Sequence, residues 1–209
     1  MENNIIRTEL SKLGLNPTAR VFYDLNPTEL IEASLINEEG KFSQAGAFVV
    51  NTSPYTGRSP NDKYIVSNGD PDLWFASGTQ AMDQQVFEAL KTKVMSHLGH
   101  KDIYLRDVRV GADPEQALNV RIISDLAWHN LAAANMFIPL EAGKPLENPD
   151  LTVVVTTTFA ADPKTDGVRS PAFIILNFDE KLVLIGTTRY AGEIKKSVFT
   201  FMNYMMPKR

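Results

Sequence analysis

Apolar segments typical of β-strands fill the last third of the chain and constrain its fold more than any other feature. Residues 151–159 are rich in Val and Thr, which favour extended backbone. Residues 173–178 and 181–185 are separated by a two-residue turn, which is the spacing of a β-hairpin. Residues 160–171 are polar and contain two prolines and a glycine, so we expect a loop there. The sheet must therefore contain at least one antiparallel pair.

Segments with helical periodicity alternate with the strand-like ones. The clearest is 79–98, where apolar side chains recur every four residues and Gly99 follows as an expected C-cap. Asn26, followed by Pro27, and Asp125 are expected N-caps. Further helices are expected within residues 1–40, at 126–137 and at 192–206.

Shorter apolar segments complete the predicted sheet. Further strands are expected at 46–50, 63–66, 103–110 and 118–123. In the third of these the alternation slips between Leu105 and Val108, which predicts a bulge. Because helices and strands interleave around a hairpin, the sequence predicts an α/β fold with a mixed sheet and flanking helices. A length of 209 residues suits one domain, 1–209, with a helical N-terminal segment, 1–40.

Composition and net charge exclude several classes of partner and of catalytic chemistry. The net charge of −4 gives no electrostatic case for nucleic-acid binding. The chain has no cysteine, which excludes disulfides, thiolate catalysis and cysteine-ligated zinc. No apolar run approaches the ~20 residues of a membrane helix, and the first residues do not resemble a signal peptide. We therefore expect a soluble, cytoplasmic protein without membrane or nucleic-acid partners.

The segment Thr-Gly-Arg-Ser-Pro at 56–60 is a candidate anion site. Gly57 permits a backbone conformation closed to other residues, and Pro60 stiffens the exit from the loop. Such a loop can hold Arg58 at a fixed angle, where a guanidinium binds a carboxylate or phosphate with two hydrogen bonds. On spacing alone, a surface arginine that is solvated or paired with an acid such as Asp62 is the commoner explanation.

The second candidate is the start of the final helix, residues 190–196. Lys195 and Lys196 oppose the helix dipole there, at a cost of roughly 0.3–1 kcal/mol each, and Glu193 offsets only part of it. A bound phosphate or other anion at the helix N-terminus would explain the pair. A lysine held neutral as a metal ligand would also explain it, since burial and a neighbouring ammonium both lower the pKa of a lysine. A solvated pair of surface lysines is the simplest alternative.

Other candidates are weaker. The apolar side chains of 199–206 are expected in the core or on a face for another domain. No G-x-x-x-x-G-K-[ST] phosphate loop occurs in the sequence. The histidines show no metal-ligand spacing with acidic residues: His97, His100 and His129.

Taken together, the two candidate segments resemble the ATP-dependent phosphoenolpyruvate carboxykinases. Residues 56–66 are similar to that family's T-G-R-S-P-x-D-K-Y-I-V stretch, with Asn61 at the variable position. Residues 190–196 resemble its Y-G-G-E-x-K-K signature, with Ala191 in place of the first glycine. The first forty or so residues match only loosely. Shorter matches follow in the same order between the two segments, at Val120-Arg121, Ala127-Trp128 and 135–138.

The resemblance implies a carboxy-lyase of gluconeogenesis that converts oxaloacetate and ATP to phosphoenolpyruvate, carbon dioxide and ADP. Decarboxylation leaves an enolate, which attacks the γ-phosphoryl group. The resemblance further implies that Arg58 and Tyr190 hold the substrate carboxylate and that Gly192 belongs to the substrate site. Lys196 would belong to the substrate site and be a neutral ligand of Mn²⁺ or Mg²⁺. Lys195 would supply positive charge near the transferring phosphate or the substrate.

Family members continue beyond the matched region with the phosphate loop and metal-binding His and Asp residues. The resemblance therefore implies a substrate-side, N-terminal domain whose partner is the C-terminal nucleotide-binding domain, with the ATP site outside this chain. We expect such a chain to bind oxaloacetate or phosphoenolpyruvate weakly and not to turn over alone. Two alternatives stay open. One is a non-catalytic module that binds small anions or pairs with another chain; the other is a shortened paralogue or fragment with an exposed apolar face at 199–206.

Overall fold

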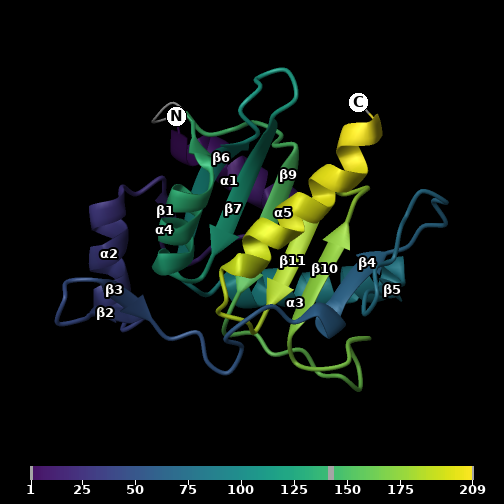
Figure 1. The fold of residues 1–209 in the computed structure, drawn as a ribbon, viewed down its shortest axis with the longest axis horizontal. Helices are drawn as coiled ribbons and strands as arrows, with labels where there is room; N and C mark the ends of the chain where they lie inside the picture. Colours follow the sequence, from purple (N-terminus) through teal and green to yellow (C-terminus); the bar gives the residue numbers. More distant parts are fainter. Residues whose placement is uncertain (1, 141–143, 209) are drawn as a thin grey trace.

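A mixed β-sheet forms the centre of the computed structural model, which describes residues 2–140 and 144–208 (Figure 1). Within these ranges the sheet has nine strands in the order β1-β6-β7-β9-β11-β10-β4-β5, with β8 beside β6. Their bounds are β1 Val21–Tyr23, β4 Lys63–Val66, β5 Gln80–Met82, β6 Ile103–Val110, β7 Leu118–Ser124, β8 Ile138–Pro139, β9 Leu151–Thr156, β10 Phe173–Asn177 and β11 Leu182–Gly186. The hairpin is confirmed, since Phe173 pairs antiparallel with Gly186 and Asn177 with Leu182. Parallel pairs such as β9 with β11 make the sheet mixed, as predicted.

Helices cover both faces of this sheet, so its strands are buried on both sides. α1 (Glu2–Lys12) and α3 (Gln84–Leu98) pack on one face, and α4 (Ala127–Met136) and α5 (Gly192–Met205) pack on the other. In Figure 1, α5 crosses in front of β11 and β10, with α3 behind them. α2 (Pro27–Ile36) packs against α4. Two short strands, β2 Gly40–Phe42 and β3 Phe48–Val50, form a separate small sheet. The structure also contains two 3₁₀ helices within the described ranges, η1 Pro60–Asp62 and η2 Met206–Lys208.

Most helix ends predicted from local sequence agree with the structure. Asn26 caps α2 by accepting hydrogen bonds from the N–H groups of Thr28 and Glu29, and the Glu29 carboxylate accepts one from the Asn26 N–H. Gly99 is the C-cap of α3, as expected. The predicted start of α3 was wrong, because residues 80–82 form strand β5 and Asp83 caps the helix instead.

Three other expectations need correction. The register between β6 and β7 is unbroken, so there is no bulge; the alternation slips because Asp107 is buried in an ion pair on a strand covered on both faces. Asp125 does not cap α4; its carboxylate accepts hydrogen bonds from the N–H groups of Thr157 and Thr158. Segment 1–40 also contains strand β1, which pairs with β6. No helix in the described ranges is long and apolar enough to cross a membrane.

Candidate functional site

The loop that carries Arg58 lies between β3 and β4 and is fastened to α5. The N–H of Ser59 donates to Oε1 of Glu193 at 2.7 Å. Arg58 itself is exposed and makes no hydrogen bond or ion pair with any residue that the structure describes. Asp62 instead binds Arg169 at 3.0 Å, so the expected alternative of an Arg58–Asp62 pair is excluded. The Arg58 guanidinium is therefore free to bind a ligand.

The glycines of the two motifs differ from expectation. Gly57 does not adopt a left-handed conformation, and a Cβ atom on it would meet no atom within 4 Å. The loop therefore does not use the left-handed conformation that Gly57 permits. At Gly192, by contrast, a Cβ atom would lie 2.3 Å from Cε1 of Tyr190, so the tyrosine ring lies directly over this glycine. Ala191 has an ordinary helical φ of −60° and a buried methyl group, so alanine fits there.

The predicted site residues lie around one cleft. Its volume is about 450 Å³, and one further residue, Phe199, completes its lining. The predicted residues that line it come from the loop before β4 and from the start of α5: Arg58, Tyr190, Gly192, Lys195 and Lys196. Segments far apart in the sequence thus meet because β4 and β10 pair next to β11, which leads into α5.

A smaller cavity of about 180 Å³ shares Arg58 and Lys196 with the cleft and adds Lys63 and Glu193. Sequence reasoning did not select these two residues, although both lie inside the matched motifs. Burial lowers the pKa of Lys63, and the positive charges of Lys196 and Arg58 lower it further. Burial likewise raises the pKa of Glu193, against the Ser59 hydrogen bond and the Arg58 charge.

The charges in this region favour an anion. Four cationic side chains surround the two cavities, whereas the carboxylate of Glu193 is buried and already accepts the Ser59 N–H. Positive charge around an open space attracts carboxylates and phosphates. The cations are Arg58, Lys63, Lys195 and Lys196.

The donor set fits a resident metal ion poorly. No group of three or more His, Asp or Glu side chains that could hold a metal occurs in the described parts of the chain. Lys196 would supply one nitrogen ligand, but its ammonium lies over the Phe199 ring, 4.6 Å from the centroid, beside Lys195. The described residues therefore do not make a metal site by themselves.

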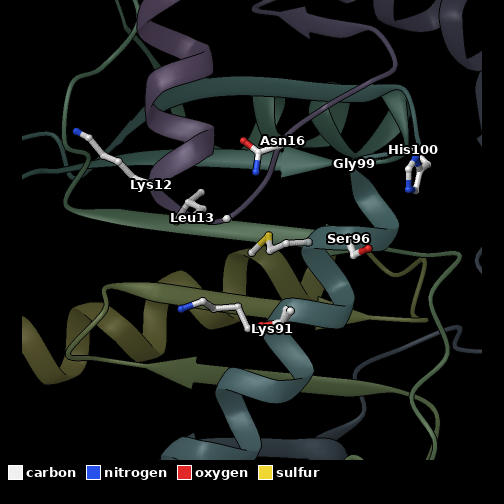
Figure 2. A pocket seen from close by; sticks show the side chains of 10 residues that line it. Lys12, Leu13, Asn16, Lys91, Ser96, Gly99 and His100 are labelled. Atoms are coloured by element: carbon white, nitrogen blue, oxygen red, sulfur yellow. The ribbon is translucent and has the colours of Figure 1, made fainter.

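A second pocket, of about 420 Å³, lies between the C-terminal ends of α1 and α3 (Figure 2). In Figure 2, Lys12 and Lys91 lie on the left of this pocket and His100 lies on the right. Both lysines are neutralised, Lys12 by Glu9 at 2.5 Å and Lys91 by Glu180 at 2.6 Å. It contains none of the predicted residues, so it offers less to an anion than the cleft does.

The aromatic residues at the end of α5 divide between core and surface. Phe201 is buried and stacks on Phe178, whereas Phe199 is 51% exposed. Trp74 is 79% exposed and, with Phe199, lines a pocket of about 300 Å³ beside the cleft. An apolar face therefore adjoins the cationic cleft.

Sequence comparison identifies the family of this site. The profile of the phosphoenolpyruvate carboxykinase family matches residues 19–209. The chain belongs to this family. Relatives named phosphoenolpyruvate carboxykinase (ATP) from Thermus thermophilus and Caldanaerobacter subterraneus are each 43% identical over 96% of the chain. One from Alkaliphilus oremlandii is 42% identical over 98%. The chain spans about 39% of the length of these phosphoenolpyruvate carboxykinases.

Proposed function

We propose that this chain forms the substrate-binding part of an ATP-dependent phosphoenolpyruvate carboxykinase. The reaction is that of a carboxy-lyase: oxaloacetate and ATP give phosphoenolpyruvate, carbon dioxide and ADP. The observation that carries the proposal is the cationic cleft, in which an unpaired Arg58 faces Tyr190 and the two lysines of α5. Both substrate and product are small carboxylate anions, which such a cleft attracts.

Each side chain of the cleft has a distinct part in this proposal. Arg58 binds the substrate carboxylate through two hydrogen bonds, and Tyr190 contacts the same group from the segment between β11 and α5. Gly192 leaves room for the Tyr190 ring. Lys195 stabilises the negative charge that develops when carbon dioxide leaves and the enolate forms. Lys196 adds positive charge to the cleft only while no metal ion is bound, because lysine binds a metal through its neutral amine.

The nucleotide and the metal belong to the complete enzyme in this proposal. The relatives' names specify ATP, and the C-terminal nucleotide-binding domain is the proposed partner of this chain. A divalent ion, Mn²⁺ or Mg²⁺, would take Lys196 as one ligand and further donors from that partner, where it would supply Lewis-acid stabilisation of the enolate. A cytoplasmic location and a place in gluconeogenesis belong to the same proposal.

Calorimetry with oxalate tests the substrate site, because oxalate is a planar dianion like the enolate. Titration at millimolar oxalate should give a binding heat that Arg58→Ala abolishes. Arg20→Ala is the matched control, since Arg20 is an exposed arginine already paired with Asp102 and lies outside the cleft. If the heat is absent, or survives in Arg58→Ala, the proposed substrate site is wrong.

The exposed aromatic residues beside the cleft favour one alternative, a non-catalytic module that binds anions and pairs with another chain. Mixing this chain with the part of the Thermus thermophilus relative that it does not match distinguishes the two. Carboxykinase activity that appears only on mixing supports the enzyme. A stable complex without activity supports the module.

A further inference from the structure

The peptide group between Arg189 and Tyr190 is held on both sides by side chains. Its carbonyl oxygen lies 2.9 Å from Nε2 of His129, and its N–H donates to Oγ1 of Thr188 at 3.1 Å. Building on the proposed function, we propose that His129 is a positioning residue that fixes the direction in which Tyr190 enters the cleft. Thr188 holds the other side of the same peptide.

The contacts of His129 define its tautomer. A carbonyl oxygen only accepts hydrogen bonds, so Nε2 carries the proton that binds Arg189. Nδ1 is then an acceptor, and the Ser124 hydroxyl donates to it at 3.0 Å. Burial, as the largest effect, lowers the pKa of His129, although the hydrogen bond to Arg189 and the carboxylates of Asp125 and Glu39 oppose this. Both ring nitrogens are therefore satisfied.

The helix turn that carries His129 is itself held in place. His129 lies in the first turn of α4, and Glu39 caps that helix from outside by accepting hydrogen bonds from the N–H groups of Ala127 and Trp128 at 3.1 and 2.9 Å. The His129 ring is 1% exposed and lies against the Trp128 ring, 4.6 Å between centroids. No substrate can reach it, so His129 acts through the Arg189 peptide and not on the reacting atoms.

The chain before this peptide is anchored separately. The N–H of Thr187 donates to the carbonyl of Thr156 at 2.9 Å, and the Thr187 hydroxyl lies 2.7 Å from the carbonyl of Phe159. The ring of Tyr190 is confined on its far side by the backbone at Gly192. Between these anchors the Arg189–Tyr190 peptide could still rotate. The hydrogen bonds to His129 and Thr188 prevent this rotation.

Fluorine NMR of the whole chain labelled with 3-fluorotyrosine tests this without any ligand. Tyr190→Phe assigns the resonance of Tyr190 among the six tyrosines. His129→Ala should shift or broaden that resonance, and His129→Gln should restore it because the glutamine amide can donate to Arg189. Asn130→Ala is the matched control: it is a buried neighbour on α4 that donates to the Tyr104 carbonyl on β6 and not to Arg189.

Thr188→Val is a second, nearly isosteric variant that removes the hydrogen bond between the Tyr190 N–H and the Thr188 hydroxyl. If His129→Ala does not fold, Thr188→Val tests the proposal instead. It should move the same resonance. The proposal is overturned if a folded His129→Ala or Thr188→Val leaves the Tyr190 resonance unchanged, or if Asn130→Ala moves it as much.

Oxalate affinity separates this proposal from the proposed function. His129→Ala should weaken oxalate binding about tenfold, as expected when one buried hydrogen bond is lost, and His129→Gln should bind nearly as the unaltered chain does. If the resonance moves but the unaltered chain binds no oxalate, the positioning role of His129 stands and the proposed substrate site fails. If His129→Ala binds oxalate as well as the unaltered chain does while the resonance moves, His129 positions Tyr190 but Tyr190 does not hold the ligand, and the part given to Tyr190 in the proposed function is wrong.

Discussion

Gly192 is the residue at which one added methyl group should disturb the cleft most. Alanine is a better helix former than glycine by about 1 kcal/mol, so Gly192→Ala should not weaken the fold through propensity. Its Cβ atom would, however, lie 2.3 Å from the Tyr190 ring, which must therefore move. We expect folded protein with weaker oxalate binding, measured by calorimetry. Gly57→Ala is the control on the facing loop, where the methyl group meets no atom within 4 Å, and equal loss in both variants would contradict the argument.

Glu193 should make the stability of the fold depend on pH. Burial, as the largest effect, raises the pKa of this carboxyl above its ordinary value of 4.5. Between the unfolded and the folded pKa the folded state holds more protons, so the free energy of unfolding falls as pH rises through that window. The stabilising contribution is complete below about pH 4.5 and is lost above the folded pKa.

Glu193→Gln cannot titrate and keeps an oxygen that accepts the Ser59 N–H. The difference in unfolding free energy, variant minus unaltered chain, should therefore grow as pH rises from about 4.5. Urea unfolding at a series of pH values measures it. Glu32→Gln, on an exposed position of α2, controls for the loss of one carboxylate from the chain. A difference that falls with pH would show that the attraction to Arg58 and Lys63 outweighs burial.

At the scale of elements, the fold relies on a helix cap supplied from a distant segment. Sequence rules placed the cap of α4 at Asp125, but Glu39, at the end of α2, accepts the first N–H groups of α4. Glu39→Ala should lower the free energy of unfolding by about 1–3 kcal/mol, because it leaves buried N–H groups without partners. Glu39→Gln should lose less, since it keeps an acceptor. Urea denaturation measures both, and the exposed Glu32→Ala, which should cost little, is the control.

Two chain segments, each adjoining the end of a strand, form the site. The loop after β3 brings Arg58, and β11 leads through Thr188 to Tyr190 and α5. The hydrogen bond from Ser59 to Glu193 joins these two segments directly. Local sequence could not predict that these two segments meet, because their contact follows from the pairing of β4 with β10, two strands far apart in the chain.

At the scale of the whole molecule, one buried ion pair joins three neighbouring strands of the sheet to the loop before β9. Asp107 on β6 accepts hydrogen bonds from Arg121 on β7 at 2.8 and 2.7 Å, from the N–H of Leu146 at 2.8 Å and from Tyr23 on β1 at 3.3 Å. Both charged side chains are 1% exposed. Asp107→Asn leaves the Arg121 charge buried, with Glu9 3.9 Å away as its remaining acidic neighbour.

Breaking a buried pair in this way costs about 3–5 kcal/mol, a large share of the stability of an ordinary domain. We therefore expect Asp107→Asn to unfold at a much lower urea concentration than the unaltered chain. Asp102→Asn breaks the exposed pair with Arg20 and should change the midpoint far less. Similar midpoints for the two variants would contradict the role assigned to the buried pair.

The sequence by itself determined the long helices, the main strands and the family. Short-range rules are sufficient for the α2 cap at Asn26, the end of α3 at Gly99 and the 173–185 hairpin, because the interactions behind them join residues close in the chain. The motifs at 56–66 and 190–196 were enough to indicate the phosphoenolpyruvate carboxykinase family and to select the residues of the cleft.

The tertiary structure decided which of these residues are free and what holds them in place. Asp62 pairs with Arg169, which leaves Arg58 without a partner among residues 2–140 and 144–208. Glu39, and not Asp125, caps α4. The tertiary structure also added Lys63, Glu193 and His129 to the account of the site. The physical reason is that burial and long-range hydrogen bonds depend on how strands pair across the sheet, and residues far apart in the chain carry no local signal of their meeting.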